Sequence, residues 1–187
     1  MLSAKEAPYQ SCYCEENVYK LLEKLKPNLD DFFAVLISND IKMIPLWKQK
    51  AERDPESFVL WDYHVITISK NSDGSAKVYD FDSWIDWGVD FQTYWNQTMN
   101  EDEMKQFREK YRRKFRIIPA RIYLSLLSSD RSHMLNPDGT YMKPPPEWPL
   151  IQNSTNSNLM NLIDMKLEFP ETMVMDETEI RRFFSDA

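Results

Sequence analysis

The sequence predicts a single domain of the α+β class, in which a mainly antiparallel sheet is flanked by helices. Two observations predict this class: strand-like runs between residues 32 and 82 follow one another with short turns, and helical patterns lie before and after them. Strands joined by short turns pair antiparallel, and helices segregated from them in sequence cover the sheet. The 187 residues suffice for a single domain over residues 1–187, with residues 1–11 expected to be a loose leader.

The first helix is predicted over residues 15–26. Val18, Leu21 and Leu25 lie on one face at helical spacing. Pro27 ends this helix, because a proline ring does not fit a helix interior.

The strands are predicted from apolar runs and turn signals. Residues 32–38 read as a buried strand, and residues 42–47 read as its hairpin partner. Residues 59–69 form the clearest strand, and a turn ending in Gly74 leads to a returning strand at residues 76–82.

The second half of the chain adds helices and a long loop. Residues 83–99 are aromatic and irregular, and the Pro144–Pro146 run is read as a stiff connector within a loop at residues 128–158. The remaining predicted elements are a helix at residues 101–114, a strand at 115–118, a helix at 119–127, and a last helix that begins at Asp176 with Glu179 completing a capping box.

The bulk composition excludes several classes of function. The net charge is −7, which argues against nucleic acid as a partner because nucleic-acid binding needs a basic face. With 3 Gly in the chain, we expect no phosphate-cradling loop. The apolar run at residues 32–37 is too short to span a membrane, and the N-terminus has no apolar core of a signal peptide.

The two cysteines stand just before and at the start of the first helix. A Cys12–Cys14 disulfide would be strained, so two free thiols are expected, which suits a reducing compartment, the cytosol or nucleus. Amides at a helix N-terminus and a nearby imidazole lower a thiol pKa, which favours Cys14 as a nucleophile. Glu15 and Glu16 oppose this effect, only weakly if they point to solvent. The alternative is that both cysteines are small buried hydrophobic residues.

The chain has two histidines, and His64 lies inside the clearest strand beside Asp62 on the same face. Asp80 and Asp82 share one face of the returning strand. One register places Asp80 opposite His64, and another, favoured by a three-residue loop ending in Gly74, places Asp82 there. Spacing alone therefore does not separate the two carboxylates as the group that orients the imidazole.

His133, in a loop-like stretch, is the rival base, with a surface histidine as its default reading. A zinc site made by Cys12, Cys14, His64 and His133 has a weak ligand spacing, and we expect no metal. A thiol, a histidine and an aspartate are together typical of a cysteine hydrolase or acyltransferase.

Two motifs carry a resemblance to a known family. Residues 11–17 (Ser-Cys-Tyr-Cys-Glu-Glu-Asn), followed by residues 61–65 (Trp-Asp-Tyr-His-Val), closely resemble the protein N-terminal glutamine amidohydrolase family. This family is also named the Trp-Asp-Tyr-His-Val motif family, after the second of these motifs. The resemblance continues in order through residues 44–49, 79–82, 113–116, 129–134 and 144–146.

The resemblance implies an α-β-α sandwich similar to the papain and transglutaminase folds, and a catalytic triad of Cys14, His64 and Asp80. It also implies a monomeric enzyme without cofactor that converts the N-terminal Gln of a protein to Glu and releases ammonia. The new Glu can then be arginylated, which marks the protein for ubiquitin-dependent degradation in the N-degron pathway. The implied partners are proteins or peptides with a free N-terminal Gln.

For substrate binding we expect an acceptor for the α-ammonium group. Asp62 is the candidate, with Glu15 behind it, and Tyr13 and Trp61 are candidates for the pocket wall. Two other classes stay open: another thiol enzyme, such as a peptidase or a transglutaminase-like acyltransferase, and a non-catalytic module that binds N-termini.

Overall fold

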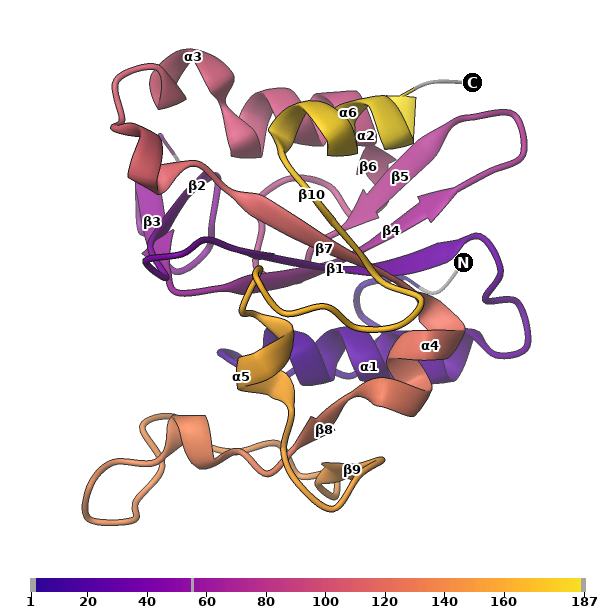
Figure 1. Cartoon of the computed structure of the whole chain (residues 1–187), viewed down its shortest axis with the longest axis vertical. Helices are drawn as coiled ribbons and strands as arrows, with labels where there is room; N and C mark the ends of the chain where they lie inside the picture. Colours follow the sequence, from indigo (N-terminus) through magenta and orange to yellow (C-terminus); the bar gives the residue numbers. More distant parts are fainter. Residues whose placement is uncertain (1–2, 55, 186–187) are drawn as a thin grey trace.

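A six-stranded sheet forms the centre of the computed structural model, which describes residues 3–54 and 56–185 (Figure 1). Its strands are β1 (Phe32–Ser38), β4 (His64–Lys70), β5 (Ala76–Tyr79), β6 (Val89–Asp90), β7 (Lys114–Pro119) and β10 (Met173–Met175). They run in the order β10-β7-β1-β4-β5-β6, and every pairing between them is antiparallel. The predicted α+β class with a mainly antiparallel sheet is confirmed.

Helices cover both faces of this sheet (Figure 1). On one face lie α1 (Cys14–Leu25), α4 (Ala120–Leu126) and α5 (Leu159–Leu162), and on the other lie α2 (Phe91–Tyr94), the π-helix η1 (Trp95–Met99) and α6 (Glu177–Ser185). β1 divides its side chains between the two cores as a strand must: Ala34 and Leu36 face α1, while Val35 and Ile37 face α6. Within the described residues no helix has the length and apolar character needed to cross a membrane.

Residues 42–47 do not pair with β1, so the predicted hairpin is wrong. β2 (Ile44–Trp47) instead pairs with β3 (Phe58–Trp61) in a separate two-stranded ribbon. The Asn39 side chain redirects the chain, because its oxygen accepts hydrogen bonds from the amides of Ile41 and Met43. β1 is left free to pair with β4 and β7 on its two sides.

The predicted strand at residues 59–69 is also broken into two. β3 ends at Trp61, and β4 begins at His64 in the other sheet. At the break, the Asp62 carboxylate accepts the Tyr63 amide proton and the Asp62 carbonyl accepts the Ser38 hydroxyl, so these groups leave the ladder. Side-chain alternation does not continue across such a break, which moves Trp61 to the His64 side.

The predicted helix at residues 101–114 shrinks to α3 (Glu101–Met104) and a 3-10 turn, η2 (Glu109–Tyr111). Phe107 packs edge-on against Trp47 and Phe58, with ring centroids 5.9 and 5.3 Å apart. This tertiary contact draws the chain out of the helical path that its spacing favours.

The predicted elements that became α1, β1, β7 and α4 are confirmed within a residue or two. The returning strand predicted over residues 76–82 is shorter, because β5 ends at Tyr79, and the stretch at residues 83–99 that was expected to be irregular contains β6, α2 and η1. The capping box of α6 forms as predicted: the Glu179 amide donates to the Asp176 carboxylate at 2.8 Å, and the Asp176 amide donates to the Glu179 carboxylate at 2.9 Å. The remaining short elements are η3 (Ser132–Met134) and the pair β8 (Ser128–Ser129) and β9 (Ile151–Gln152).

The predicted loose leader has no helix or strand over residues 3–11, and residues 1–2 lie outside the described part. It is nevertheless held to the domain. The Tyr9 hydroxyl donates to Asp82 at 2.7 Å, and the backbone of Gln10 makes two hydrogen bonds with the Asn17 side chain at 2.7 and 2.8 Å.

Candidate active site

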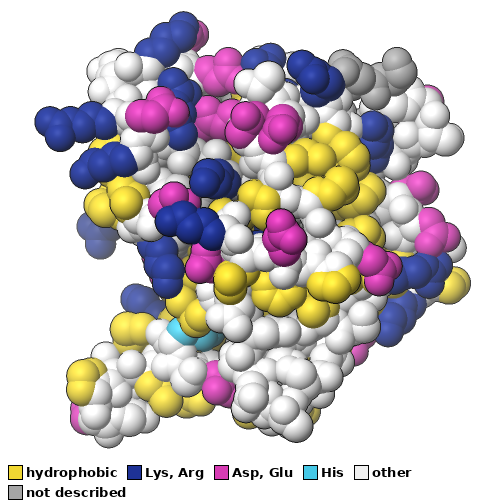
Figure 2. Space-filling model, in the orientation of Figure 1, with side chains coloured by type: hydrophobic (Ala, Val, Ile, Leu, Met, Phe, Trp, Pro, Cys, Tyr) yellow, Lys and Arg dark blue, Asp and Glu magenta, His cyan; other side chains and the backbone are white. Residues whose placement is uncertain are grey.

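The N-terminus of α1 and the start of β4 meet at a cavity of about 200 Å³. α1 carries Cys14 to it and β4 carries His64 to it. Figure 2 shows a hollow on this side of the molecule, bordered by hydrophobic side chains and with a histidine at its base. The residues that line the cavity are Cys12, Cys14, Trp61, Asp62, Tyr63, His64, Asp82, His133, Met134, Met142 and Met160. The structure therefore brings together the predicted nucleophile and base.

Asp80 is the carboxylate that orients the imidazole. Its Oδ1 lies 2.9 Å from His64 Nε2, and both side chains are almost fully buried. The β4–β5 register pairs Thr67 with Tyr79, which is the register that the three-residue loop favours and which would place Asp82 opposite His64. The strands part after Tyr79, however, because the Lys50 amide pairs with the Asp82 carbonyl at 2.7 Å and draws the chain away.

The Asp80 carboxylate accepts four hydrogen bonds. Oδ1 accepts from His64 and from the Asp82 amide at 2.9 Å, and Oδ2 accepts from the Tyr94 hydroxyl at 2.7 Å and the Gln49 amide at 3.3 Å. Sequence reasoning missed Tyr94 and Gln49, since a partner on another element leaves no local signal. These donors hold the carboxylate in one orientation.

Asp80 and His64 each stabilise the charged form of the other. Burial raises the pKa of Asp80, but the charge and hydrogen bond of His64 outweigh burial, so the pKa lies below its usual value. Burial likewise lowers the pKa of His64, but the charge and hydrogen bond of Asp80 raise it above its usual value. Trp61 stacks on the imidazole, with ring centroids 5.4 Å apart and planes 15° apart. The imidazole is therefore both oriented and ionisable.

His64 Nδ1 is buried and has no hydrogen-bond partner among the described residues. Because Nε2 is held by Asp80, Nδ1 is the nitrogen left to exchange a proton with a thiol or a substrate. An unpaired buried nitrogen of this kind costs stability, and it is typical of a catalytic group.

The resting thiol differs from the expectation. Burial raises the pKa of Cys14 well above its usual value, and the charge of Glu15 raises it further. A hydrogen bond from the Val65 backbone opposes this shift without cancelling it. Glu15 and Glu16 do not point to solvent, as both are fully buried. The predicted lowering by the helix terminus is therefore outweighed, and the resting form is the neutral thiol.

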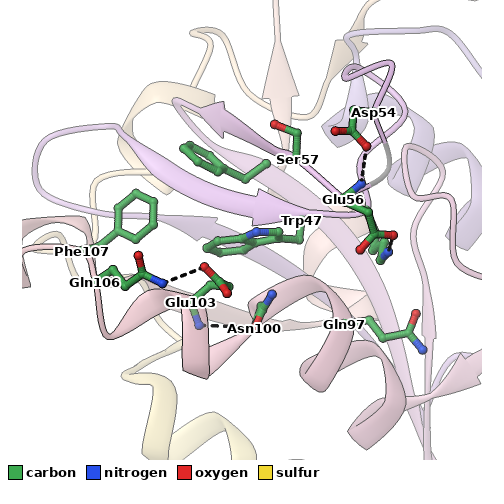
Figure 3. A pocket seen from close by; sticks show the side chains of 11 residues that line it. Trp47, Asp54, Glu56, Ser57, Gln97, Asn100, Glu103, Gln106 and Phe107 are labelled. Atoms are coloured by element: carbon green, nitrogen blue, oxygen red, sulfur yellow. Dashed lines mark hydrogen bonds and ion pairs between the residues drawn. The ribbon is translucent and has the colours of Figure 1, made fainter.

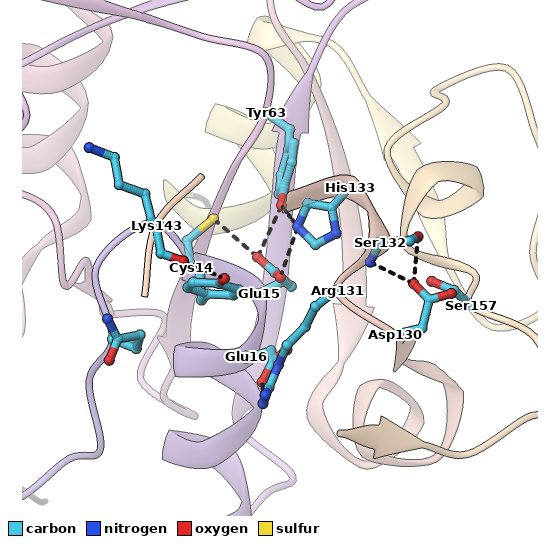
Figure 4. A network of polar contacts seen from close by, with 12 residues as sticks. Cys14, Glu15, Glu16, Tyr63, Asp130, Arg131, Ser132, His133, Lys143 and Ser157 are labelled. Atoms are coloured by element: carbon cyan, nitrogen blue, oxygen red, sulfur yellow. Dashed lines mark hydrogen bonds and ion pairs between the residues drawn. The ribbon is translucent and has the colours of Figure 1, made fainter. Parts of the chain in front are cut away.

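Glu15 belongs to a polar cluster beside the thiol (Figure 4). Its Oε2 accepts from the Tyr63 hydroxyl at 3.1 Å and lies 3.8 Å from Cys14 Sγ, and its Oε1 lies 3.5 Å from His133 Nε2. Burial raises the pKa of Glu15 to about 8, although its own backbone amide opposes the shift. Burial lowers the pKa of His133, which keeps this imidazole neutral. His133 thus lines the cavity instead of lying on an open surface.

A second buried carboxylate is fully paired. Glu16 accepts two hydrogen bonds from Arg131, at 2.8 and 2.7 Å, and one from the Trp148 indole at 2.6 Å. Figure 4 shows Arg131 reaching down to Glu16 from the segment that also carries His133. This bidentate pair ties the first turn of α1 to the cavity wall at residues 131–148.

The predicted substrate-binding residues fall into two groups: those that line the cavity and those that do not. Asp62 is exposed and lines the cavity. Tyr13 is fully buried, donates its hydroxyl to the Lys143 carbonyl at 3.2 Å and is absent from the cavity wall. Glu15 lies beneath the wall and is not part of it. Trp61, the other predicted wall residue, lines the cavity together with Asp62. The structure therefore supports Asp62 and Trp61, and not Tyr13 or Glu15, as groups that reach a ligand directly.

Within the described ranges, one group of side chains has the spacing of metal ligands, namely His64, Asp80 and Asp82, with ligand atoms within 4.8 Å of one another. These atoms already serve as hydrogen-bond partners: Asp80 uses both oxygens as described, and Asp82 accepts from Tyr9. The zinc set weighed from the sequence does not coincide with this group, since it shares only His64 with it.

A larger hollow of about 700 Å³ lies elsewhere, between the β2–β3 ribbon and α3 (Figure 3). Its wall combines the aromatic rings of Trp47, Phe58 and Phe107 with the carboxylates of Asp54 and Glu103. No cysteine or histidine lines it. The cysteine and histidine side chains line the smaller cavity instead.

Comparison with known proteins places this chain in a family. A family model described as N-terminal glutamine amidase matches residues 9–184. A Caenorhabditis briggsae protein named protein N-terminal glutamine amidohydrolase is 98% identical over 187 residues, covering 100% of both chains. Proteins of the same name from Caenorhabditis elegans and Homo sapiens are 60% identical over 185 residues (99% of this chain, 100% of the relative) and 42% identical over 160 residues (83% and 76%). The chain belongs to the protein N-terminal glutamine amidohydrolase family.

Proposed function

We propose that this chain hydrolyses the side-chain amide of an N-terminal glutamine of a protein or peptide, producing glutamate and ammonia. One observation carries the proposal: a buried thiol and a carboxylate-oriented imidazole with a free nitrogen open on one small cavity. The names of the relatives supply the substrate, and the geometry supplies the chemistry that it requires.

In the first half of the reaction, Cys14 attacks the side-chain carbonyl carbon of glutamine. Because the resting thiol is neutral, His64 Nδ1 takes its proton as the C–S bond forms. The tetrahedral intermediate collapses when the imidazolium returns that proton to the amide nitrogen, and ammonia leaves. Asp80 stabilises the imidazolium throughout.

In the second half, His64 removes a proton from water, and the hydroxide attacks the glutamyl thioester. The C–S bond breaks, Cys14 recovers a proton from the imidazolium, and the carboxylic acid that forms releases its proton to solvent as the glutamate carboxylate leaves. No metal or organic cofactor is required by these steps.

Selection of an N-terminal residue requires an acceptor for its α-ammonium group. Asp62 is our candidate, because its carboxylate lies on the cavity wall and one oxygen is engaged only with the neighbouring Tyr63 amide. Exchanging Asp62 for Asn is expected to raise KM for a Gln-initiated peptide, and an unchanged KM would remove Asp62 from this role.

The cellular setting is also a proposal. The enzyme is proposed to act as a monomer in the cytosol and nucleus, and its two free thiols suit these reducing compartments. The glutamate product would then present a new N-terminus for arginylation in the N-degron pathway.

The deciding experiment measures ammonia release from three peptides: one with an N-terminal Gln, its N-acetylated twin, and one with Gln in the interior. Release from the first alone supports the proposal. Release from all three would indicate a general glutaminyl acyl-transfer enzyme. Such an enzyme would also link an added amine to the glutamine side chain of the peptide. Peptide cleavage would indicate a peptidase, and binding without turnover would indicate a non-catalytic module.

A further inference from the structure

The first turn of α1 carries two glutamates that are equally buried but differently paired. Glu15 and Glu16 are both 0% exposed. Both oxygens of Glu16 accept hydrogen bonds from the Arg131 guanidinium. Among the described residues no lysine or arginine pairs with Glu15, and its Oε1 is buried without a hydrogen-bond partner. Because a buried charge needs a partner, this contrast indicates that Glu15 is neutral and carries its proton in the folded chain.

The elements packed against Glu15 present uncharged groups to it. From the residue before β4, the Tyr63 hydroxyl donates to Oε2 at 3.1 Å, and from η3, His133 Nε2 lies 3.5 Å from Oε1 (Figure 4). From α4, the Tyr123 hydroxyl donates to the Glu15 backbone carbonyl at 3.0 Å. Burial raises the pKa of both tyrosines and lowers the pKa of His133, so these three side chains are neutral near pH 7.

Apart from histidines and tyrosines, the ionisable side chains around this cluster are acidic, with one arginine among them. Within the described residues they are Glu16, Asp62, Asp82, Asp130 and Arg131. The Arg131 guanidinium is already bound to Glu16 and to the carbonyls of Pro146 and Trp148. An ionised Glu15 would therefore add a negative charge to acidic surroundings, which further favours its protonated form.

The proton of Glu15 matters because of the distance between its carboxyl and the nucleophile. Oε2 lies 3.8 Å from Cys14 Sγ and accepts from the thiol. When Cys14 passes its proton to His64, the sulfur becomes negative beside this carboxyl. At an effective dielectric constant of about 20, a negative charge on Glu15 at 3.8 Å would disfavour the thiolate by roughly 10³-fold, whereas a protonated carboxyl adds no such repulsion.

We propose that Glu15 must keep its proton for Cys14 to react, so that loss of this proton at alkaline pH stops the enzyme. Glu15 is a positioning residue that acts through Cys14, since it lies beneath the cavity wall. At neutral pH the thiol proton moves to His64 Nδ1 and the Glu15 proton stays in place. At alkaline pH the Glu15 proton passes to solvent, and the thiol retains its own. The proposal rests on the proposed function, because the reaction that it controls is the attack of Cys14 on glutamine.

The test compares kcat/KM for a Gln-initiated peptide between Glu15→Gln and the natural chain across neutral and alkaline pH. Glutamine keeps the size and neutrality of the protonated carboxyl and cannot ionise. Burial raises the pKa of Glu15 to about 8, so the ratio of kcat/KM in the variant to that in the natural chain should rise about tenfold from pH 7 to pH 9. The peptide α-amino group titrates in the same range, but it does so equally with both proteins. A constant ratio would overturn the proposal.

Glu23→Gln is the matched control, because Glu23 is an exposed glutamate on the same helix and pairs with Lys20 at 2.8 Å. The ratio of its kcat/KM to that of the natural chain should stay constant over the same pH range. A rise in this control equal to that of Glu15→Gln would show a general effect of removing charge from α1, and it would also overturn the proposal.

An infrared measurement on the natural chain does not depend on how the variant folds. A buried protonated carboxyl gives a carbonyl band that is separate from the bands of a carboxylate. In the natural chain this band should be present at pH 6 and disappear with a midpoint near the Glu15 pKa of about 8. Absence of such a titration from the natural chain overturns the proposal.

Alkylation of Cys14 by iodoacetamide separates this proposal from the reaction itself. In the Cys12→Ala background at pH 9, without peptide, Glu15→Gln should speed alkylation by at least about tenfold, because the thiolate no longer faces a carboxylate. Equal alkylation rates with and without this substitution overturn the role of Glu15. Absence of ammonia from every Gln-initiated peptide with the natural chain overturns the proposed function instead, and it leaves the alkylation result standing.

Discussion

Exchange of Asp80 for Asn tests the electrostatic core of the site. The carboxylate lies 2.9 Å from His64 Nε2, which places the centres of the two charges roughly 4 Å apart. At an effective dielectric constant of about 20, their attraction is about 4 kcal/mol. If the imidazolium forms in the transition state, losing this attraction should lower kcat by about 10³-fold.

The same exchange also removes hydrogen bonds that the Asp80 carboxylate accepts. Asn offers one oxygen to the four donors that Asp80 satisfies, so the Gln49 amide or the Tyr94 hydroxyl loses its acceptor. An unsatisfied buried donor costs about 1–3 kcal/mol, and the melting temperature should fall accordingly. Asp82→Asn is the matched control, because Asp82 accepts a side-chain hydrogen bond only from Tyr9 among the described residues and should lose less than about tenfold in kcat.

The assay is ammonia release from a Gln-initiated peptide across a range of pH. Asp80 raises the pKa of His64, so the acidic limb of kcat/KM should move to lower pH when the charge is removed. A purely structural role would lower activity without moving this limb. A folded Asp80→Asn enzyme with kcat within tenfold of the natural value and an unmoved limb would refute the reasoning, as would a larger loss in Asp82→Asn.

Three further predictions concern α1. Cys14→Ala should abolish ammonia release and Cys12→Ala should largely preserve it; the reverse result would move the nucleophile to Cys12. Arg131→Met leaves the Glu16 charge buried without its partner, which should cost about 3–5 kcal/mol in urea unfolding, and equal stability would contradict this account. Glu15 keeps its proton in the folded chain up to a pKa of about 8, while the unfolded carboxyl loses it near 4.5. The folded state thus binds more protons in this window, and stability conferred at low pH is lost as pH rises. Glu15→Gln should therefore gain in melting temperature relative to the natural chain from pH 5 to pH 8, and a constant difference would argue against a protonated Glu15.

Elements with strong local signals are those that the sequence predicts correctly. Apolar spacing and Pro27 define α1, and the Asp176–Glu179 box defines the start of α6. The three-residue loop ending in Gly74 sets the β4–β5 register, since Gly74 adopts a φ of 82° that favours glycine. These signals act over a few residues, so they can be read in the sequence alone.

The elements that the sequence predicts wrongly are those interrupted by contacts with residues far away in the sequence. The Ser38 hydroxyl donates to the Asp62 carbonyl, and the predicted strand is interrupted there, before His64. Phe107 packs against the aromatic rings of the β2–β3 ribbon, and the predicted helix around it does not form. Neither partner lies near in sequence, so period-2 or period-3.6 patterns continue through both sites without a break.

The sequence by itself determined the candidate nucleophile and base, because a chain with two cysteines and two histidines offers few choices and α1 places Cys14 at its first turn. Only the tertiary structure decided that Asp80, and not Asp82, orients His64, because strand separation after Tyr79 is imposed by pairing of Asp82 with Lys50. It also decided the charge of the thiol. Residues from several elements pack around Cys14 and enclose Glu15 beside it. Burial and the charge of Glu15 raise the pKa of Cys14, and they outweigh the lowering by the helix dipole that the sequence predicts.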